Sequence, residues 1–190
     1  MTEPGSAPSD VLAFWFGAGG KSRAEWFRKD AAFDGEIRER FGALHAEASA
    51  GGLVAWEDEP RSALALVLVL DQFSRNLHRN DPRAFAQDAR ALRVAEKMLA
   101  NGWHRELQPL ERQFVYLPLE HAEDLARQDR SVALFKELQA MPGMEGIAQW
   151  AEKHRAVIRR FGRFPHRNAA LGRTSTPEEA AFILTPGSGF

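Results

Sequence analysis

The chain has 190 residues, of which 44% are hydrophobic and 27% are charged, and its formal net charge is -1. This is the composition of a folded globular protein, and the near balance of charge excludes one that draws nucleic acid or an anionic membrane to it through its overall field. The sequence has no cysteine, which excludes disulfides, thiolate nucleophiles and cysteine-based zinc or iron–sulfur sites.

We expect no signal peptide at the start of the chain. Residues 1–9 are rich in proline, glycine and serine and lack the basic and apolar segments of a signal peptide. The longest apolar run, residues 63–70, is far shorter than the roughly 18 residues of a membrane-spanning helix. We therefore expect a disordered tail over residues 1–9, one helical domain over residues 10–190, a cytoplasmic location and no contact with a membrane.

The N-terminal region contains two short elements. Residues 11–16 form an aromatic-rich run that Ser9 or Asp10 can cap and that a glycine ends, so we expect a short buried helix. Ser22, with Glu25 three residues later, has the spacing of a capping box and predicts a short turn.

Two longer helices follow. Asp34 is expected to cap a helix whose apolar positions repeat over residues 37–48 and that the glycine pair 51–52 ends. Pro60 suits the first turn of a helix that runs to about Asn76. This helix is apolar on nearly every side, so we expect it to lie at the centre of the fold.

The middle of the chain contains two helices that begin with proline. Asp81 is a cap before Pro82, and the apolar stripe that follows continues to the next glycine. Pro109 opens the second helix, in which Pro118 lacks a backbone donor. We expect Pro118 to kink or break this helix before residues 120–124 continue it.

Three shorter helices close the chain. Ser131 begins the first, and residues 147–161 form the second, which Gly162 ends. Thr176, with Glu179 three residues later, forms a capping box ahead of the last helix. No segment alternates polar and apolar residues as a strand would.

Helices of this length joined by short turns predict an all-α, single-domain antiparallel helical bundle. The helix lengths and spacings are also close to those of helix-turn-helix repeats of roughly 34 residues, although the consensus of such repeats is not legible in the chain.

One cationic segment stands apart from this periodicity. Residues 153–173 contain seven Lys or Arg and no Asp or Glu. Its central part, residues 159–173, combines arginines with phenylalanines, glycines and a proline, and is called the arginine turn below. Because the whole chain is nearly neutral, this turn predicts acidic partners elsewhere in the chain or an anionic ligand.

Five segments together resemble a bacterial family of unknown function. They are residues 11–17, 70–76, 117–124, 160–168 and 174–179. The resemblance extends from about residue 11 to the end of the chain. It implies an all-helical, tetratricopeptide-like fold and a bacterial cytosolic protein, and it assigns no chemistry. The chain departs from the family pattern at Ser74, where many relatives carry a proline.

Three helices turn polar on faces that should be packing. Asp71 and Arg75 lie four residues apart on the apolar face of the central helix, His121 and Asp124 extend the stripe after Pro109, and His154 interrupts another apolar face. Buried charges need partners. We therefore expect one joined cluster with the arginine turn, in which Asp71 is buried and paired with an arginine of residues 163–173.

Two interpretations of this cluster remain open. In the structural one, Arg163, Arg167 and Arg173 bind carboxylates and fasten helix ends. The carboxylates would be Asp71, Glu120 and Asp124. In the functional one, the arginines hold a carboxylate or phosphate ligand and a histidine transfers a proton. His166 and Arg167 would then be partly exposed, whereas the structural interpretation buries them.

The candidate catalytic residues are Glu120, His121, His154 and His166. The candidate ligand-binding residues are Asp71, Arg75, Asn76, Glu120, His121, Asp124, Arg163, His166, Arg167, Asn168 and Arg173. No Glu-x-x-His pair, His-Glu-x-x-His motif, phosphate loop or Gly-x-Ser-x-Gly elbow occurs, so we expect no metal and no cofactor.

Two functions follow as hypotheses. The first is an intracellular binding or interaction module whose groove takes a protein or a small anionic ligand. The alternative is an enzyme that acts on a small phosphate or carboxylate metabolite, with arginines as anion clamps and a histidine as acid or base. One local basic patch does not predict a nucleic-acid partner.

Overall fold

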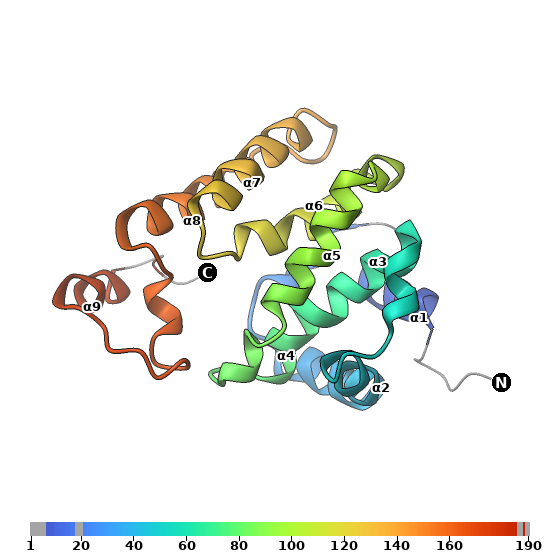
Figure 1. The fold of residues 1–190 in the computed structure, drawn as a ribbon, viewed down its shortest axis with the longest axis horizontal. Helices are drawn as coiled ribbons and strands as arrows, with labels where there is room; N and C mark the ends of the chain where they lie inside the picture. The colour runs from blue at the N-terminus through green and yellow to red at the C-terminus, as the bar shows by residue number, and fades with distance from the viewer. Residues whose placement is uncertain (1–6, 18–20, 186–187, 189–190) are drawn as a thin grey trace. The chain divides into compact units, whose positions relative to one another are not determined.

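In the computed structural model of the protein, residues 7–17, 21–185 and 188 are described. The described residues form helices and no strand (Figure 1), which confirms the predicted all-α fold. They pack as two compact units: unit 1 lies within residues 1–79 and 83–118, and unit 2 within residues 80–82 and 119–190. The assignment of residues 10–190 to a single domain stays a prediction, and the predicted tail falls mostly outside the described residues.

Unit 1 contains most of the helices. They are α1 (Pro8–Phe16), α2 (Ala31–Ser49), α3 (Pro60–Val67), α4 (Ser74–Leu77), α5 (Asp88–Ala100) and most of α6 (Pro109–Glu120). A π-helical segment, Leu68–Phe73, joins α3 to α4 without a break, and short 3-10 turns lie at Ala24–Trp26, Val54–Asp58 and Trp103–Glu106.

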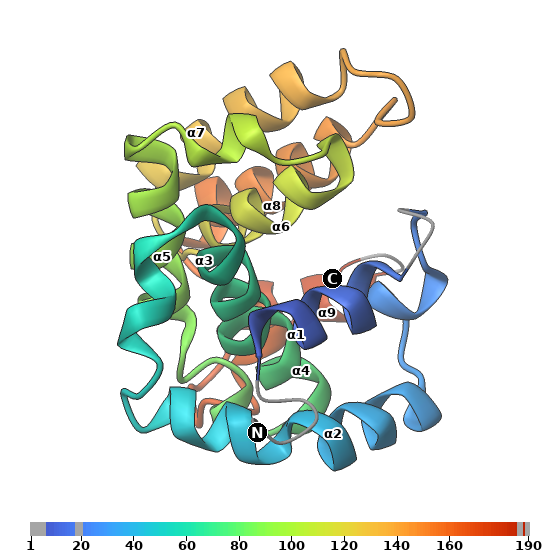
Figure 2. The ribbon, with the colours of Figure 1, turned by 90° about the vertical axis from the view of Figure 1, so that its right-hand side faces the viewer.

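The central element of unit 1 is the continuous helix made of α3, the π-helical segment and α4. Every residue from 63 to 74 is buried, as its apolar sequence predicted. Helix α3 contacts α1 and α5, and the π-helical segment contacts α2 and α5. Figure 2 shows α1 alongside α3. An aromatic cluster fills the space beside them, with Phe14 stacked on Phe33 and Trp15 stacked on Trp26.

Helices α1 and α2 begin earlier in the chain than predicted. Proline at position 8 starts α1, with Ala7 as its N-cap residue, and Asp10 accepts a hydrogen bond from the Ala7 amide. Asp30 caps α2, because its side chain accepts from two backbone amides of the first turn. The predicted cap, Asp34, lies inside α2 and accepts hydrogen bonds from Asn76 and Arg79.

The short turn predicted after Ser22 is found at Ala24–Trp26, but its predicted capping box and the predicted helix start at Asp81 are wrong. The 3-10 turn Ala24–Trp26 has no side-chain cap, so Ser22 and Glu25 do not form a capping box. After Asp81, a 3-10 turn at Pro82–Ala84 comes first, and the regular helix α5 begins only at Asp88.

Unit 2 is built from α7 (Leu125–Leu138), α8 (Ala148–Phe161), a 3-10 turn at Pro165–Arg167 and α9 (Pro177–Ile183). Helices α7 and α8 lie side by side (Figure 1). Ion pairs join Lys136 to Glu152 and Asp129 to Arg155, so the two helices run antiparallel. Phe164 packs with apolar residues of α8 to form the core of this unit.

The junction between α6 and α7 differs from the prediction. Helix α6 passes through Pro118 and ends at Glu120, so residues 121–124 do not continue it. Asp124 is instead the N-cap of α7, and its carboxylate accepts from the Arg127 amide at 2.9 Å. Ser131 therefore lies inside α7 and does not begin a helix.

The ends of α8 and α9 confirm their predictions. Gly162 ends α8 with a φ of 70°, a backbone conformation that glycine adopts without strain. Thr176 and Glu179 form the capping box of α9. Among the helices that the structure describes, none is long and apolar enough to cross a membrane.

Candidate functional site

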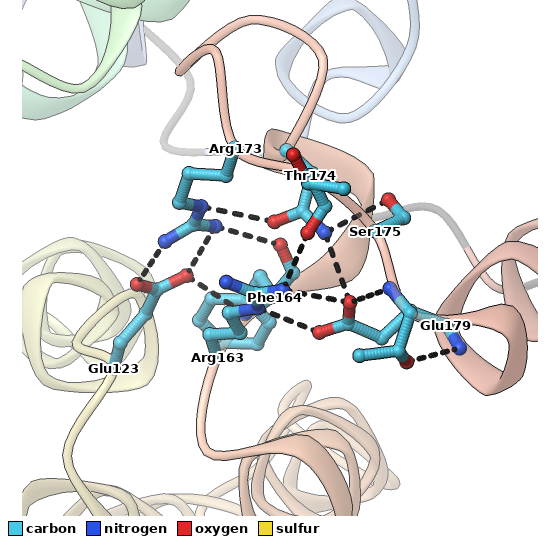
Figure 3. A network of polar contacts seen from close by, with 9 residues as sticks. Glu123, Arg163, Phe164, Arg173, Thr174, Ser175 and Glu179 are labelled. Carbon is cyan, nitrogen blue, oxygen red and sulfur yellow. Dashed lines mark hydrogen bonds and ion pairs between the residues drawn. The ribbon is translucent and has the colours of Figure 1, made fainter.

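The arginine turn is held to the α6–α7 junction by Glu123. Arg173 donates to both carboxylate oxygens of Glu123, at 2.7 and 3.0 Å, and the backbone amide of Phe164 donates to the same carboxylate at 2.7 Å (Figure 3). Arg173 also donates to the Phe164 carbonyl and to the Asn168 side chain. Burial raises the pKa of Glu123, but these hydrogen bonds from Arg173 and Phe164 outweigh it and lower the pKa. Glu123 is thus an ionised anchor for the turn.

A second carboxylate holds the same turn from α9. Arg163 donates to both oxygens of Glu179, at 2.6 and 2.8 Å, and to the Thr174 carbonyl at 2.9 Å (Figure 3). The Thr176 amide and Asn168 also donate to Glu179. The hydrogen bonds from Arg163, with that from Thr176, lower the pKa of Glu179 to about 2.

These two forked pairs differ from the predicted ones. The acids that meet Arg163 and Arg173 are Glu179 and Glu123, whereas Asp124 pairs with Arg127 of its own helix. The reason is the end of α6 at Glu120, because the non-helical residues 121–124 bring Glu123 to the turn and leave Asp124 as a cap. The acidic run 120–124 did indicate a partner for the turn, but only the backbone decides which acid reaches it.

Glu120 has a different partner, a histidine of α8. Its Oε1 lies 3.0 Å from His154 Nδ1, and both side chains are buried. The same nitrogen lies 2.9 Å from the Trp150 carbonyl. A carbonyl oxygen can only accept, so Nδ1 carries a hydrogen in this geometry and points it toward Trp150 and Glu120.

The second oxygen of Glu120 has no such partner. Glu120 is only 3% exposed, yet its Oε2 makes no hydrogen bond to any described residue. The Glu120 backbone is by contrast well held, because Gln128 donates to the Glu120 carbonyl at 2.6 Å and to that of Ala122 at 2.8 Å. Gln128 is fully buried, and nothing in the sequence around it indicated this capping role.

The three candidate histidines of unit 2 gather around Glu120 and Phe164. The ring of His121 lies 6.2 Å from that of His154, and the Phe164 ring lies 5.6 Å from both His154 and His166. Arg167 is buried, with its guanidinium 4.6 Å from the centre of the Phe164 ring. His166 is half-buried. The imidazoles of His154 and His166 and the guanidinium of Arg167 therefore lie around the Phe164 ring, and Glu120 and His121 lie beside His154.

The other candidate residues belong to unit 1. Asp71 is fully buried and accepts from Arg75 at 3.0 Å and from Gln72 at 2.6 Å. Arg75 also donates to both oxygens of Asp88. Burial lowers the pKa of Arg75, but the charges of Asp71 and Asp88 raise it above its ordinary value. Asn76 binds Asp34.

The predicted pairing of Asp71 with an arginine of the arginine turn would link unit 1 to unit 2. That pairing and the single joined cluster stay predictions. Asp88 and Glu123 were missed as partners of Arg75 and Arg173. Each lies more than three turns away along the chain from its arginine, so helical spacing could not pair them. No group of three or more His, Asp or Glu in the described part of the chain could hold a metal ion.

The helical units and these polar pairs define an all-α protein in which many arginines bind carboxylates and the buried His154 lies beside Glu120. Residues 11–187 match the family described as "Bacterial protein of unknown function (DUF924)", and the chain belongs to this family.

The solved structure of the protein of unknown function ATU0120 from Agrobacterium tumefaciens is similar to this chain. The two are 39% identical with a TM-score of 0.84, over 93% of this chain and 96% of that one. The curated proteins contain no significant match.

Proposed function

We propose that the protein is a binding module of the tetratricopeptide-like kind, in which Glu120 and His154 of unit 2 take a small polar ligand. The observation that carries this proposal is the buried Glu120 Oε2, which no described residue binds. The antiparallel pair α7 and α8 supports the comparison with stacked helical hairpins, whose faces commonly form binding surfaces.

The energetics favour a ligand that donates a hydrogen bond. A buried acceptor without a partner costs about 1–3 kcal/mol, and more when it is charged. A ligand hydroxyl or amino group that donates to Glu120 Oε2 would recover this cost. Such groups are therefore the recognition chemistry that the site suits best.

The arginine turn also favours a hydrogen-bond donor over an anion as the ligand. Arg163 and Arg173 each bind both oxygens of a carboxylate within unit 2. An anionic ligand that used them would have to displace Glu179 and Glu123, which also hold backbone amides. We assign these two arginines a structural role.

An enzyme is the second candidate, and the orientation of His154 favours it. Since Nδ1 carries a hydrogen toward Glu120, the neutral ring has its lone pair on Nε2. A carboxylate that orients a histidine in this way is a recurrent arrangement for a general base. The substrate class would be a small polar metabolite with a hydroxyl group for His154 to deprotonate.

The test compares ligand-induced thermal shifts in three proteins: wild type, Glu120→Gln and Glu178→Gln. A panel of polyols, amines, amino acids, phosphates and carboxylates would be screened on wild type. Glu120→Gln replaces an accepting oxygen with an amide that donates, so a ligand of this site should bind at least tenfold more weakly. Glu178 lies on the surface in a pair with Arg160, and its variant should bind as wild type does.

The outcomes separate the alternatives. A panel without any stabilising compound, or hits that bind equally to wild type and Glu120→Gln, would contradict the proposed site. Incubation of each hit with wild type, followed by proton NMR, decides between a module and an enzyme. Conversion of the hit that His154→Gln abolishes would establish the enzyme.

A further inference from the structure

Unit 1 contains a cavity of about 520 Å³ beside α2, α4 and the segment that precedes α5. A cavity of this size is in the range of small-molecule sites. Its polar lining comes from those three places in the chain. The polar and charged residues are Arg38, His45, Ser49, His78, Arg83 and Gln87, and the others are small or apolar. None of the described residues that line it is acidic.

Arg38 brings a positive charge to the rim of this cavity. Its guanidinium donates to the Leu77 carbonyl at 3.2 Å, which directs the side chain toward the C-terminal end of α4. Within the described part of the chain, Arg38 makes no ion pair, because Asp34, one turn earlier on α2, binds Arg79 and Asn76. The remaining N–H groups of Arg38 are therefore suited to an anion.

His45 is fixed in orientation at the cavity. Its Nε2 lies 2.9 Å from the Ser74 hydroxyl, which donates its own hydrogen to the Leu70 carbonyl at 2.6 Å. Since a hydroxyl has one hydrogen, the histidine nitrogen must be the donor in this pair. The ring of His78 lies 5.4 Å from that of His45. The cavity thus has two adjacent imidazoles, of which His45 cannot turn.

Ser49 supplies an independent indication of a ligand. It lies at the last position of α2, and its buried hydroxyl makes no hydrogen bond to any described residue. The free carbonyl groups at the C-terminal end of a helix carry partial negative charge and therefore disfavour a bound anion. Here Arg90 donates to the carbonyls of Ala48 and Gly52, at 2.6 and 2.8 Å, and so reduces the negative potential at this helix end.

We infer that this cavity of unit 1 binds a small organic phosphate. The phosphate oxygens would accept hydrogen bonds from Arg38, Arg83, His78 and Ser49, and the organic part would lie against Leu77 and Ala86. Donors from three separate segments surround a tetrahedral group better than a planar carboxylate. This site lies in unit 1 and is independent of the function proposed for Glu120 and His154.

The experiment is a titration followed by NMR of the histidine side chains. The probes are inorganic phosphate, glycerol 3-phosphate and glycerol, added at constant ionic strength to wild type, Arg38→Gln, Arg83→Gln and Arg40→Gln. Both phosphates should shift the ring signals of His45 and His78 in a saturable way, and glycerol should not. Either cavity variant should weaken the binding of both phosphates at least fivefold.

Arg40→Gln is the matched control, because Arg40 is on the same helix and pairs with Glu36 outside the cavity. It should bind phosphate as wild type does. Ring signals that do not move, shifts that grow linearly without saturation, or equal binding in Arg38→Gln and Arg40→Gln would each overturn the inference. Circular dichroism of each variant confirms that a loss of binding is not a loss of folding.

Discussion

Three carboxylates of this protein are buried to the same degree and differ in their partners. Asp71, Glu120 and Glu179 are each at most 3% exposed. Asp71 and Glu179 bind arginines, which neutralise them, whereas Glu120 binds one nitrogen of a histidine and keeps an oxygen without a described partner. Burial alone therefore does not distinguish these acids; the proposal for Glu120 rests on its incomplete set of hydrogen bonds.

Asp71→Ala tests the structural role of the first carboxylate. The variant removes the acceptor of Arg75 and Gln72 and leaves a cavity in the central helix. Breaking a buried ion pair costs about 3–5 kcal/mol, and we expect about 3 kcal/mol because Arg75 retains Asp88. Urea denaturation measures the change. The control is Asp58→Ala, whose exposed pair with Lys97 should be worth less than about 1 kcal/mol; an equally small effect of Asp71→Ala would contradict its role.

The pH dependence of stability tests the environment of His45. Burial, together with the neighbouring His78, lowers the pKa of His45 to about 4 from 6.5. Between these values the unfolded chain binds the proton and the folded chain does not, so stability decreases as the pH falls through this window. Relative to His45→Gln, wild type should lose about 2 kcal/mol between pH 7 and pH 5.

Gln at position 45 is the appropriate comparison because it can still donate to Ser74 but does not titrate. The free energies of unfolding are measured in the absence of phosphate, so that the cavity lined by Arg38 and Arg83 stays without that anion. Parallel pH profiles for wild type and variant would show that His45 titrates normally in the folded protein.

At the scale of secondary-structure elements, the sequence predicted which helices exist better than where they begin. Periodic apolar positions located α2, the central helix and α8, because burial of one face decides them. The start of α2 was misplaced because Asp30 and Asp34 lie four residues apart and the backbone selects Asp30 as the cap. Helix α1 was misplaced because it begins at Pro8, before both predicted caps. The end of α6 was also predicted with an error of a few residues. The prediction therefore placed Asp124 at the arginine turn, where the structure has Glu123.

A double-mutant cycle on Glu123 and Arg173 tests how the arginine turn is fastened. The two side chains make a forked pair and are about one quarter exposed. Such charge-assisted pairs are stronger than ordinary surface pairs, so we expect a coupling of about 1–2 kcal/mol between Glu123→Gln and Arg173→Gln. Arg173→Lys should recover only part of it, since lysine cannot form the fork. A coupling near zero, measured by urea denaturation, would show that the pair does not hold the turn.

At the scale of the whole molecule, the numbers of acidic and basic residues nearly balance, and many opposite charges are also paired locally. The cations of the arginine turn meet Glu123, Glu178 and Glu179. Sequence patterns predicted that such acids must exist and that the fold is all-α. They did not predict the cavity of unit 1, because it is lined by residues 38–50 of α2 and its C-cap and by residues 77–87, which start at the end of α4 and are mostly not helical, and no pattern in the sequence joins these two segments.

The most direct test of the proposed function is long-range proton–nitrogen NMR of the His154 ring, in wild type and in Glu120→Gln. We predict that neutral His154 carries its hydrogen on Nδ1, and that a ligand found by thermal shift changes the His154 signals in wild type but not in Glu120→Gln. A hydrogen on Nε2 in the free protein, or a ligand response that Glu120→Gln leaves unchanged, would contradict the assignment of Glu120 and His154 as the binding pair.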